Sequence, residues 1–296
     1  MSAFKFNAWS RLAACLLFVT ACGGTAWAFE LPKVADADMA HLPMSIQMKI
    51  SSAYTHASRS PDDPDKLSSL GALYYVQGFG REAAQCFERV AEIKGKVGVW
   101  WYYAGLAHEK AQDPARAIAA YEKVLSITGG GSYEPACVRL AELLLPTDPA
   151  RAGELCRKAV ELNRSSPRAY YGLGRAALAL GRPEDALAAF RKAVGYAPAF
   201  VEAHRAAAEV LTALGRTAEA DKHRRLADAG GETPELDDPA TVALYRAGLH
   251  PKVLCDDALT LARQGNLRQA EDMLVQARQI GTAGTLPDEV EATLLF

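Results

Sequence analysis

Residues 170–198, YYGLGRAALALGRPEDALAAFRKAVGYAP, decide the fold of this chain. Small, aromatic and turn-forming residues recur along the stretch at the intervals expected for two helices joined by a turn: Tyr170, Leu173, Gly174, Ala177, Gly181, Ala186, Phe190, Ala193 and Pro198. Gly181 permits the backbone conformation that ends the first helix. Pro183, Glu184 and Asp185 favour the start of the second helix, because proline and acidic groups suit a helix N-terminus.

The same pattern returns along most of the chain. The alanines at 83, 117, 152, 186 and 220 are spaced by 34, 35, 34 and 34 residues, and Ala270 follows after 50. This pattern resembles the tetratricopeptide repeat, a helix–turn–helix unit of about 34 residues. The resemblance implies an all-α fold, a right-handed superhelical solenoid of helix–turn–helix repeats in which each unit packs only against its neighbours. We expect the small residues of the two helices of a unit to face each other.

The repeat also divides the chain. We expect a signal peptide over residues 1–28, an N-terminal capping segment over 29–62, and five repeat units over 63–229. A linker over 230–250, with a short helix near Thr241–Ala247, should precede a sixth unit and a C-terminal capping helix over 251–296. Capping elements are expected because a single repeat cannot bury its own apolar face.

The first 28 residues have the three parts of a secretory signal. Lys5 and Arg11 precede an apolar run over residues 12–21, and Ala26-Trp27-Ala28 forms a small-x-small cleavage site. We therefore expect an exported, periplasmic protein of a bacterium whose mature chain begins near Phe29. The alternative is a lipoprotein, because residues 19–22 resemble a lipobox that would leave Cys22 as the lipid anchor and so provide the only expected membrane attachment.

Composition excludes other classes of function. The chain carries 33 basic and 35 acidic side chains, a formal net charge of −2, which provides no cationic field for nucleic acid. The sequence contains no Gly-x-Ser-x-Gly elbow, no His-Glu-x-x-His pair and no phosphate-binding loop. We therefore expect a protein that is not an enzyme and needs no cofactor.

The resemblance also implies where a partner would bind. In this family the first helices of the units line a concave groove that holds a segment of another protein. The groove positions of this chain are Tyr75, Tyr102, Leu106, Glu109, Arg168, Tyr171, Arg175, Arg205 and Glu209. Tyrosine and arginine are frequent in binding surfaces, although the same residues could be an ordinary solvated face. Ser68 and Ala72 replace the Lys and Asn of the repeats that clamp a chaperone C-terminus, so that type of partner is not expected.

Two of the cysteines are candidates for a disulfide. Cys137 and Cys156 fall on the two helices of the third unit, where antiparallel packing would place them side by side. Export would favour a bridge between them, and the alternative is two small buried thiols. Cys86 and Cys255 are expected to remain unpaired.

Histidines and methionines suggest a second function. Met39, His41, Met44, Met48 and His56 could bind copper, although methionines at this spacing more often pack a capping helix. His108 should pack in the core, and His204 and His223 should lie near each other. The sequence thus favours a scaffold that binds another protein, in the assembly of an envelope or redox complex, over a periplasmic metal- or haem-handling accessory protein. No haem-attachment motif occurs in the sequence.

Overall fold

The computed structural model describes residues 29–127 and 133–280, and every regular element within them is an α-helix, as predicted. The helices all fall in one unit that begins at Pro32. The expected signal peptide, the candidate lipidation site Cys22 and the C-terminal capping helix lie outside the described residues. Among the helices described, none is both long enough and apolar enough to cross a membrane.

Ten of these helices form five consecutive helix–turn–helix pairs, each with a first helix A and a second helix B. The pairs are α4 (Pro64–Val76) with α5 (Gly80–Lys94), α6 (Gly98–Lys110) with α7 (Pro114–Ile127), α8 (Glu134–Leu144) with α9 (Pro149–Leu162), α10 (Pro167–Ala179) with α11 (Pro183–Tyr196), and α12 (Val201–Ala213) with α13 (Thr217–Asp228). In the first four pairs helix B also packs against helix A of the next pair. This stacking is the architecture of an all-α solenoid.

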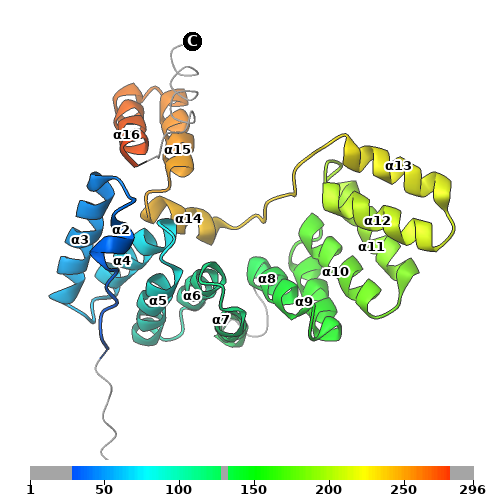
Figure 1. The fold of residues 1–296 in the computed structure, drawn as a ribbon, viewed down its shortest axis with the longest axis horizontal. Coiled ribbons are helices and arrows are strands. Elements are labelled where there is room, and N and C mark those ends of the chain that lie inside the picture. The colour runs from blue at the N-terminus through cyan, green and yellow to red at the C-terminus, as the bar shows by residue number, and fades with distance from the viewer. Residues whose placement is uncertain (1–28, 128–132, 281–296) are drawn as a thin grey trace, which may run out of the picture. The chain divides into compact units, whose positions relative to one another are not determined.

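Helices at both ends complete the stack. The short α2 (Asp36–Met39) and the longer α3 (Met44–Ser58) precede the first pair, and α3 packs on α4. After α13 the chain runs through an extended linker into α14 (Pro239–Ala247), which covers the residues where the sequence predicts a short helix. A sixth pair, α15 (Pro251–Arg263) and α16 (Leu267–Ile280), follows. Contacts of α14 with α4 and α6 return the chain to its first two repeats (Figure 1).

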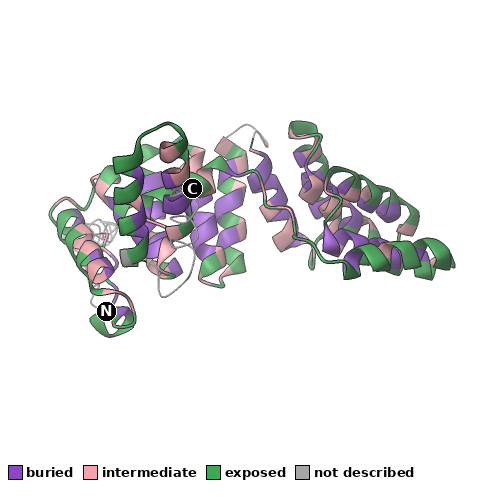
Figure 2. Cartoon of the chain, turned by 90° about the horizontal axis from the view of Figure 1, so that it is seen from above, coloured by how far each residue is buried: buried purple, intermediate pink, exposed green. Residues whose placement is uncertain are grey.

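In the first, second and fourth pairs, a glycine of helix A lies in close contact with an aromatic ring of helix B. A Cβ atom added at Gly71 would lie 2.9 Å from the Phe87 ring, and one at Gly174 would overlap the Phe190 ring. The atoms nearest to these glycines belong to the rings, and not to the small residues that were expected to face them. Glycine is required in helix A because a flat ring of helix B packs directly on its backbone. Figure 2 shows that the buried residues lie where neighbouring helices meet.

Most of the turns between A and B helices contain a left-handed residue. Gly78, Gly181, Gly215 and Gly265 have φ values of 93°, 70°, 73° and 82°, a region that glycine enters without steric cost. In the second repeat the same place is taken by Gln112, with a φ of 58°. That turn therefore carries strain that the glycine-containing turns do not.

Candidate partner-binding site

The predicted groove residues all lie on A helices, whose shared surface we call the A-helix face. The structure separates them into two groups. In the first two repeats Tyr102 is 0% exposed, and Tyr75 and Leu106 are also buried. In the fourth and fifth repeats Arg175, Arg205 and Glu209 are exposed. The A-helix face is thus covered at one end and open at the other.

The cover over the first repeats is the chain's own α14. The rings of Tyr75 on α4 and Tyr245 on α14 stack with centroids 5.8 Å apart. At the end of α14, Gly248 approaches so closely that a Cβ there would overlap Val76 and the backbone oxygen of Ala72. α14 therefore occupies part of the surface on which the sequence places a partner.

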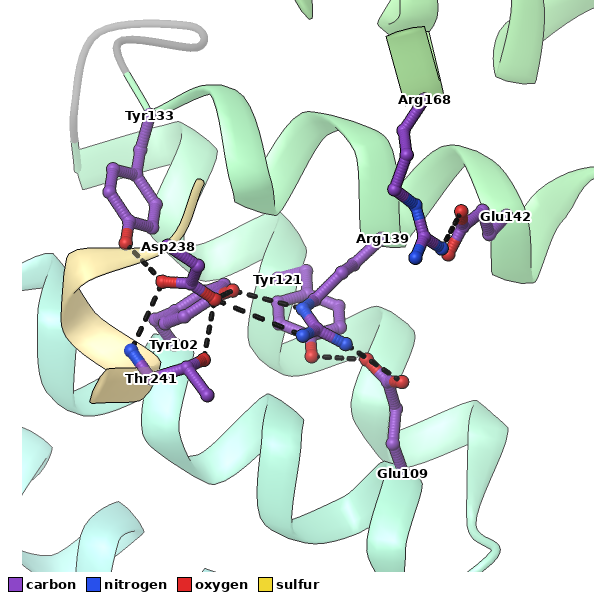
Figure 3. Close-up of polar contacts among 9 residues, drawn as sticks. All are labelled: Tyr102, Glu109, Tyr121, Tyr133, Arg139, Glu142, Arg168, Asp238 and Thr241. Carbon is purple, nitrogen blue, oxygen red and sulfur yellow. Dashed lines mark hydrogen bonds and ion pairs between the residues drawn. The ribbon is translucent and has the colours of Figure 1, made fainter. Parts of the chain in front are cut away.

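A buried aspartate, Asp238, anchors this cover. Its carboxylate is only 5% exposed, and it accepts hydrogen bonds from the hydroxyls of Tyr102 and Tyr133, the latter at 2.7 Å (Figure 3). It also caps α14, accepting from the Thr241 backbone N–H at 3.1 Å and from the Thr241 hydroxyl. One side chain thus starts α14 and fixes it to two repeats.

Arg139 of α8 balances this carboxylate. Its Nε donates to the Tyr102 hydroxyl at 2.9 Å, and its Nη2 lies 3.8 Å from Asp238 (Figure 3). On its other side Nη1 lies 3.5 Å from Glu109, which also accepts from the Tyr121 hydroxyl. The guanidinium therefore bridges two carboxylates, which satisfies the rule that buried charges are paired.

The pKa shifts at this site keep its donors protonated. Burial raises the pKa of Tyr102; nearby Arg139 opposes that shift and Asp238 adds to it. Burial also raises the pKa of Tyr133, with a further contribution from its hydrogen bond to Asp238. Burial disfavours the Arg139 charge, but Tyr102, Tyr121 and Glu109 outweigh it and raise the pKa of Arg139. At neutral pH the pocket therefore presents two hydroxyl donors and one cation to a carboxylate.

The linker before α14 also touches the repeats. The Thr233 hydroxyl donates to Glu202 of α12. Leu236 packs against the cluster that contains Cys137 and Val138 of α8. Residues 232–248, which we call the return segment, therefore contact A helices of the first, second, third and fifth repeats.

The open end of the A-helix face is built around Tyr171. Its ring packs on Phe190 and Phe200, with centroids 5.7 Å and 5.0 Å away. The Arg175 guanidinium lies 5.8 Å from the centre of the same ring, and Arg168 forms an ion pair with Glu142. Burial raises the pKa of Tyr171, and Glu209 is among the charges that act on its hydroxyl. These predicted groove residues therefore form one surface around a fixed aromatic ring.

A cleft of about 500 Å³ lies along the return segment and α15, with Arg139 and Arg168 of the A-helix face on its other wall. Its lining carries both signs of charge, and the residues that supply them include Arg246, Asp238 and Asp257. A further cleft of about 580 Å³ lies between α3, α4 and the end of α14. The first cleft shares Arg139 and Asp238 with the buried pocket.

Sequence reasoning missed Tyr133, Arg139, Asp238 and Thr241. Arg139 lies on helix A of the third repeat, for which no groove residues were predicted. The Asp238-Pro239 pair was a usable signal, because aspartate before proline is a typical helix start. The Asp238-Pro239 pair predicts the start of α14, but it does not indicate which helices α14 packs against.

The two cysteines proposed for a disulfide are free thiols in this structure. Cys137 and Cys156 are both buried. Burial raises the pKa of the Cys137 thiol to about 11 and that of Cys156 to about 12. Here the two thiols pack as small core residues. A disulfide between them stays a prediction for the exported protein.

The structure brings two of the histidines together and leaves two of the methionines exposed. His204 and His223 do lie together, with their Nδ1 atoms 2.9 Å apart, and His204 Nε2 lies 3.0 Å from the Pro198 carbonyl oxygen. Met44 and Met48 are 68% and 66% exposed, so the prediction that they pack a capping helix is wrong. Within residues 29–127 and 133–280, no three His, Cys, Asp or Glu side chains are placed to hold a metal ion.

Solved structures share this fold. MamA from Desulfovibrio magneticus RS-1, from residue 41 to its end, is 22% identical with a TM-score of 0.52, and the match covers 56% of this chain and 94% of that one. PilF of Pseudomonas aeruginosa is 17% identical with a TM-score of 0.50, covering 78% of this chain and 97% of that one. At these identities the likeness concerns the fold.

The family is shown by the sequence itself. No curated protein matches the chain. The family model of the tetratricopeptide repeat matches residues 69–132, 147–198 and 171–231, which together span half of the chain. These ranges contain the helix pairs from α4 to α13, apart from the first residues of α4 and the whole of α8. The chain therefore belongs to the tetratricopeptide repeat family.

Proposed function

We propose that this protein is a non-catalytic scaffold that holds a segment of another polypeptide on the open end of its A-helix face. Stacked repeats form extended, rigid surfaces that suit this task. The observation that carries the proposal is the group of exposed charges, Arg175, Arg205 and Glu209, beside the fixed ring of Tyr171. Arginine and tyrosine on a rigid support are the side chains that dominate binding energy in protein interfaces.

We place this activity outside the cytoplasm. The support is the signal-like pattern of residues 1–28, with cleavage before Phe29 or lipidation at Cys22 as its two outcomes. Assembly of an envelope or redox complex is the setting that we propose. The mass of the mature N-terminus, measured on protein from a bacterial envelope, distinguishes the two outcomes, and an intact Met1 would contradict export.

The test of binding is a comparison of three purified chains as baits for envelope proteins. The first is the unaltered chain, and the second carries Arg175→Ala, Arg205→Ala and Glu209→Ala. We expect the second to lose a specific partner that the first retains. A partner retained equally by both would contradict the proposal.

The third chain is the matched control. It carries Arg157→Ala, Glu161→Ala and Lys222→Ala, which remove the same charges from exposed positions on B helices. The control should keep the partner, and its helical circular dichroism should equal that of the other two. Equal loss in both variants would show that net charge, and not the A-helix face, determines capture.

A further inference from the structure

We propose that the pocket formed by Tyr102, Tyr133 and Arg139 is a receptor for an acidic segment of a partner protein, in which an aspartate caps a short helix. In this structure the return segment fills the pocket through Asp238, as a ligand carried by the same chain. This inference rests on the proposed scaffold function and deepens it, because it names the chemistry of the partner segment.

The pocket has the features of a built carboxylate site. Its three donors come from two different repeats, Tyr102 from α6 and Tyr133 and Arg139 from the start and middle of α8. They converge on one carboxylate that is 5% exposed (Figure 3). Hydrogen bonds between charged and neutral groups at a buried site are stronger than neutral ones and fix the direction of approach.

The return segment shows what else a ligand would provide. Seven residues after Asp238, Tyr245 stacks on Tyr75, so an aromatic residue two turns into the helix reaches the first repeat. Two residues before Asp238, Leu236 packs on an apolar cluster of the third repeat. Glu235 and Asp237 are exposed and leave the segment acidic. The recognised pattern is thus an apolar residue, an aspartate that begins a helix, and an aromatic residue.

The covalent link between the return segment and the repeats lowers the apparent affinity of the pocket for a free segment. A segment joined to its receptor by a short linker is present at an effective concentration of about a millimolar. A free segment of the same chemistry therefore competes with the return segment and binds weakly until the latter is released. Substitution of Asp238 should release it without altering the receptor side chains.

The test uses a labelled peptide with the sequence of residues 232–249, ETPELDDPATVALYRAGL, titrated by fluorescence anisotropy into the full chain. We expect the Asp238→Ala chain to bind this peptide at least tenfold more tightly than the unaltered chain. Asp237→Ala is the matched control, because Asp237 is the exposed neighbour, and it should leave the affinity unchanged. Asp238→Asn is a second releasing variant that keeps the shape of the side chain, should alanine lower the helical circular dichroism.

Three results support the pocket itself. A peptide with alanine in place of its second aspartate should lose the gain in affinity. In the Asp238→Ala chain, Tyr133→Phe should weaken peptide binding by about tenfold, since it removes one hydrogen bond to the carboxylate. Arg139→Gln should weaken it as well, and the weakening should shrink as salt is raised.

Two results would overturn the proposal. One is equal peptide affinity in the unaltered, Asp237→Ala and Asp238→Ala chains. The other is concentration-dependent dimerisation that Tyr133→Phe abolishes, together with no peptide binding, which would make a second copy of the chain the occupant. Neither result depends on Arg175, Arg205 and Glu209, whose substitution tests the scaffold function. Failure of the pocket proposal is therefore distinguishable from failure of the scaffold function.

Discussion

The Tyr133 hydroxyl donates to the Asp238 carboxylate at 2.7 Å, across 105 residues of chain. This bond joins the third repeat to the helix that precedes the sixth. It ties a segment without the repeat pattern to a surface built by the repeat pattern. Contacts within a solenoid are mostly local, so a bond of this separation constrains the chain far more than the bonds within a repeat.

Replacement of Gly174 by alanine should destabilise the fold. A Cβ there overlaps the Phe190 ring, which is fully buried. Overpacking of this kind costs about 1–3 kcal/mol. Chemical denaturation followed by circular dichroism measures the free energy of unfolding.

The control for this substitution is Gly195→Ala. Gly195 lies in the last turn of α11, and an added Cβ meets nothing within 4 Å. Alanine there should be neutral or should stabilise by up to about 1 kcal/mol, because alanine has the higher helix propensity. Equal losses at both glycines would contradict the ring-on-glycine packing.

Gln112→Gly should stabilise the second turn. Gln112 has a φ of 58°, a region that costs a non-glycine residue about 1 kcal/mol. The gain should be somewhat smaller than this, because glycine also increases the entropy of the unfolded chain. Gln77→Gly is the matched control: Gln77 has a φ of −83°, so glycine there should only destabilise. A loss of stability in Gln112→Gly equal to that in Gln77→Gly would show that the second turn is not strained.

The helix pairs to which these substitutions belong are visible in the sequence, whereas the ring on Gly174 and the backbone of Gln112 are not. Alanine and glycine spacings predict the helix pairs, and the register of the repeat alone places His204 beside His223. The pocket at Asp238 is different in kind. Tyr102 and Asp238 are 136 residues apart, and the linker that carries Asp238 has no periodicity from which a contact could be inferred. Packing outside the repeat is determined by tertiary contacts, which cannot be predicted from local sequence patterns.

Acidification should destabilise the fifth repeat through His223. Burial lowers the pKa of His223 below its ordinary value of 6.5, and nearby His204 lowers it further. The unfolded chain then binds more protons than the folded one between the lowered pKa and 6.5, so the free energy of unfolding falls as pH decreases through 6.5. Above that range the contribution of His223 is constant.

Thermal denaturation at pH 7.5 and pH 5.5 measures this effect. His223→Gln should reduce the loss of stability between the two pH values, whereas substitution of the exposed His41→Gln should leave it unchanged. Some loss should persist in His223→Gln, because burial also lowers the pKa of His250, with Lys110 and Lys252 adding to that shift. An identical pH dependence in His223→Gln and the unaltered chain would refute the role of the pair.

Thiol chemistry distinguishes the two states of the third repeat. As free, buried thiols with raised pKa values, Cys137 and Cys156 should react with a thiol reagent only after unfolding. Denaturing, non-reducing conditions should then reveal four thiols in the chain from residue 29 onward, at Cys86, Cys137, Cys156 and Cys255. A count of two, restored to four by reductant, would show that the exported protein forms the bridge instead.

The central claim is that the return segment is held on the A-helix face by Asp238. Amide hydrogen exchange across α14 tests it most directly, with α11 as the internal reference. We predict that α14 amides are protected in the unaltered chain and exchange about tenfold faster in Tyr133→Phe, which loses one hydrogen bond to a buried carboxylate, while α11 is unchanged. Unprotected α14 amides in the unaltered chain, or equal rates in both chains, would contradict the account.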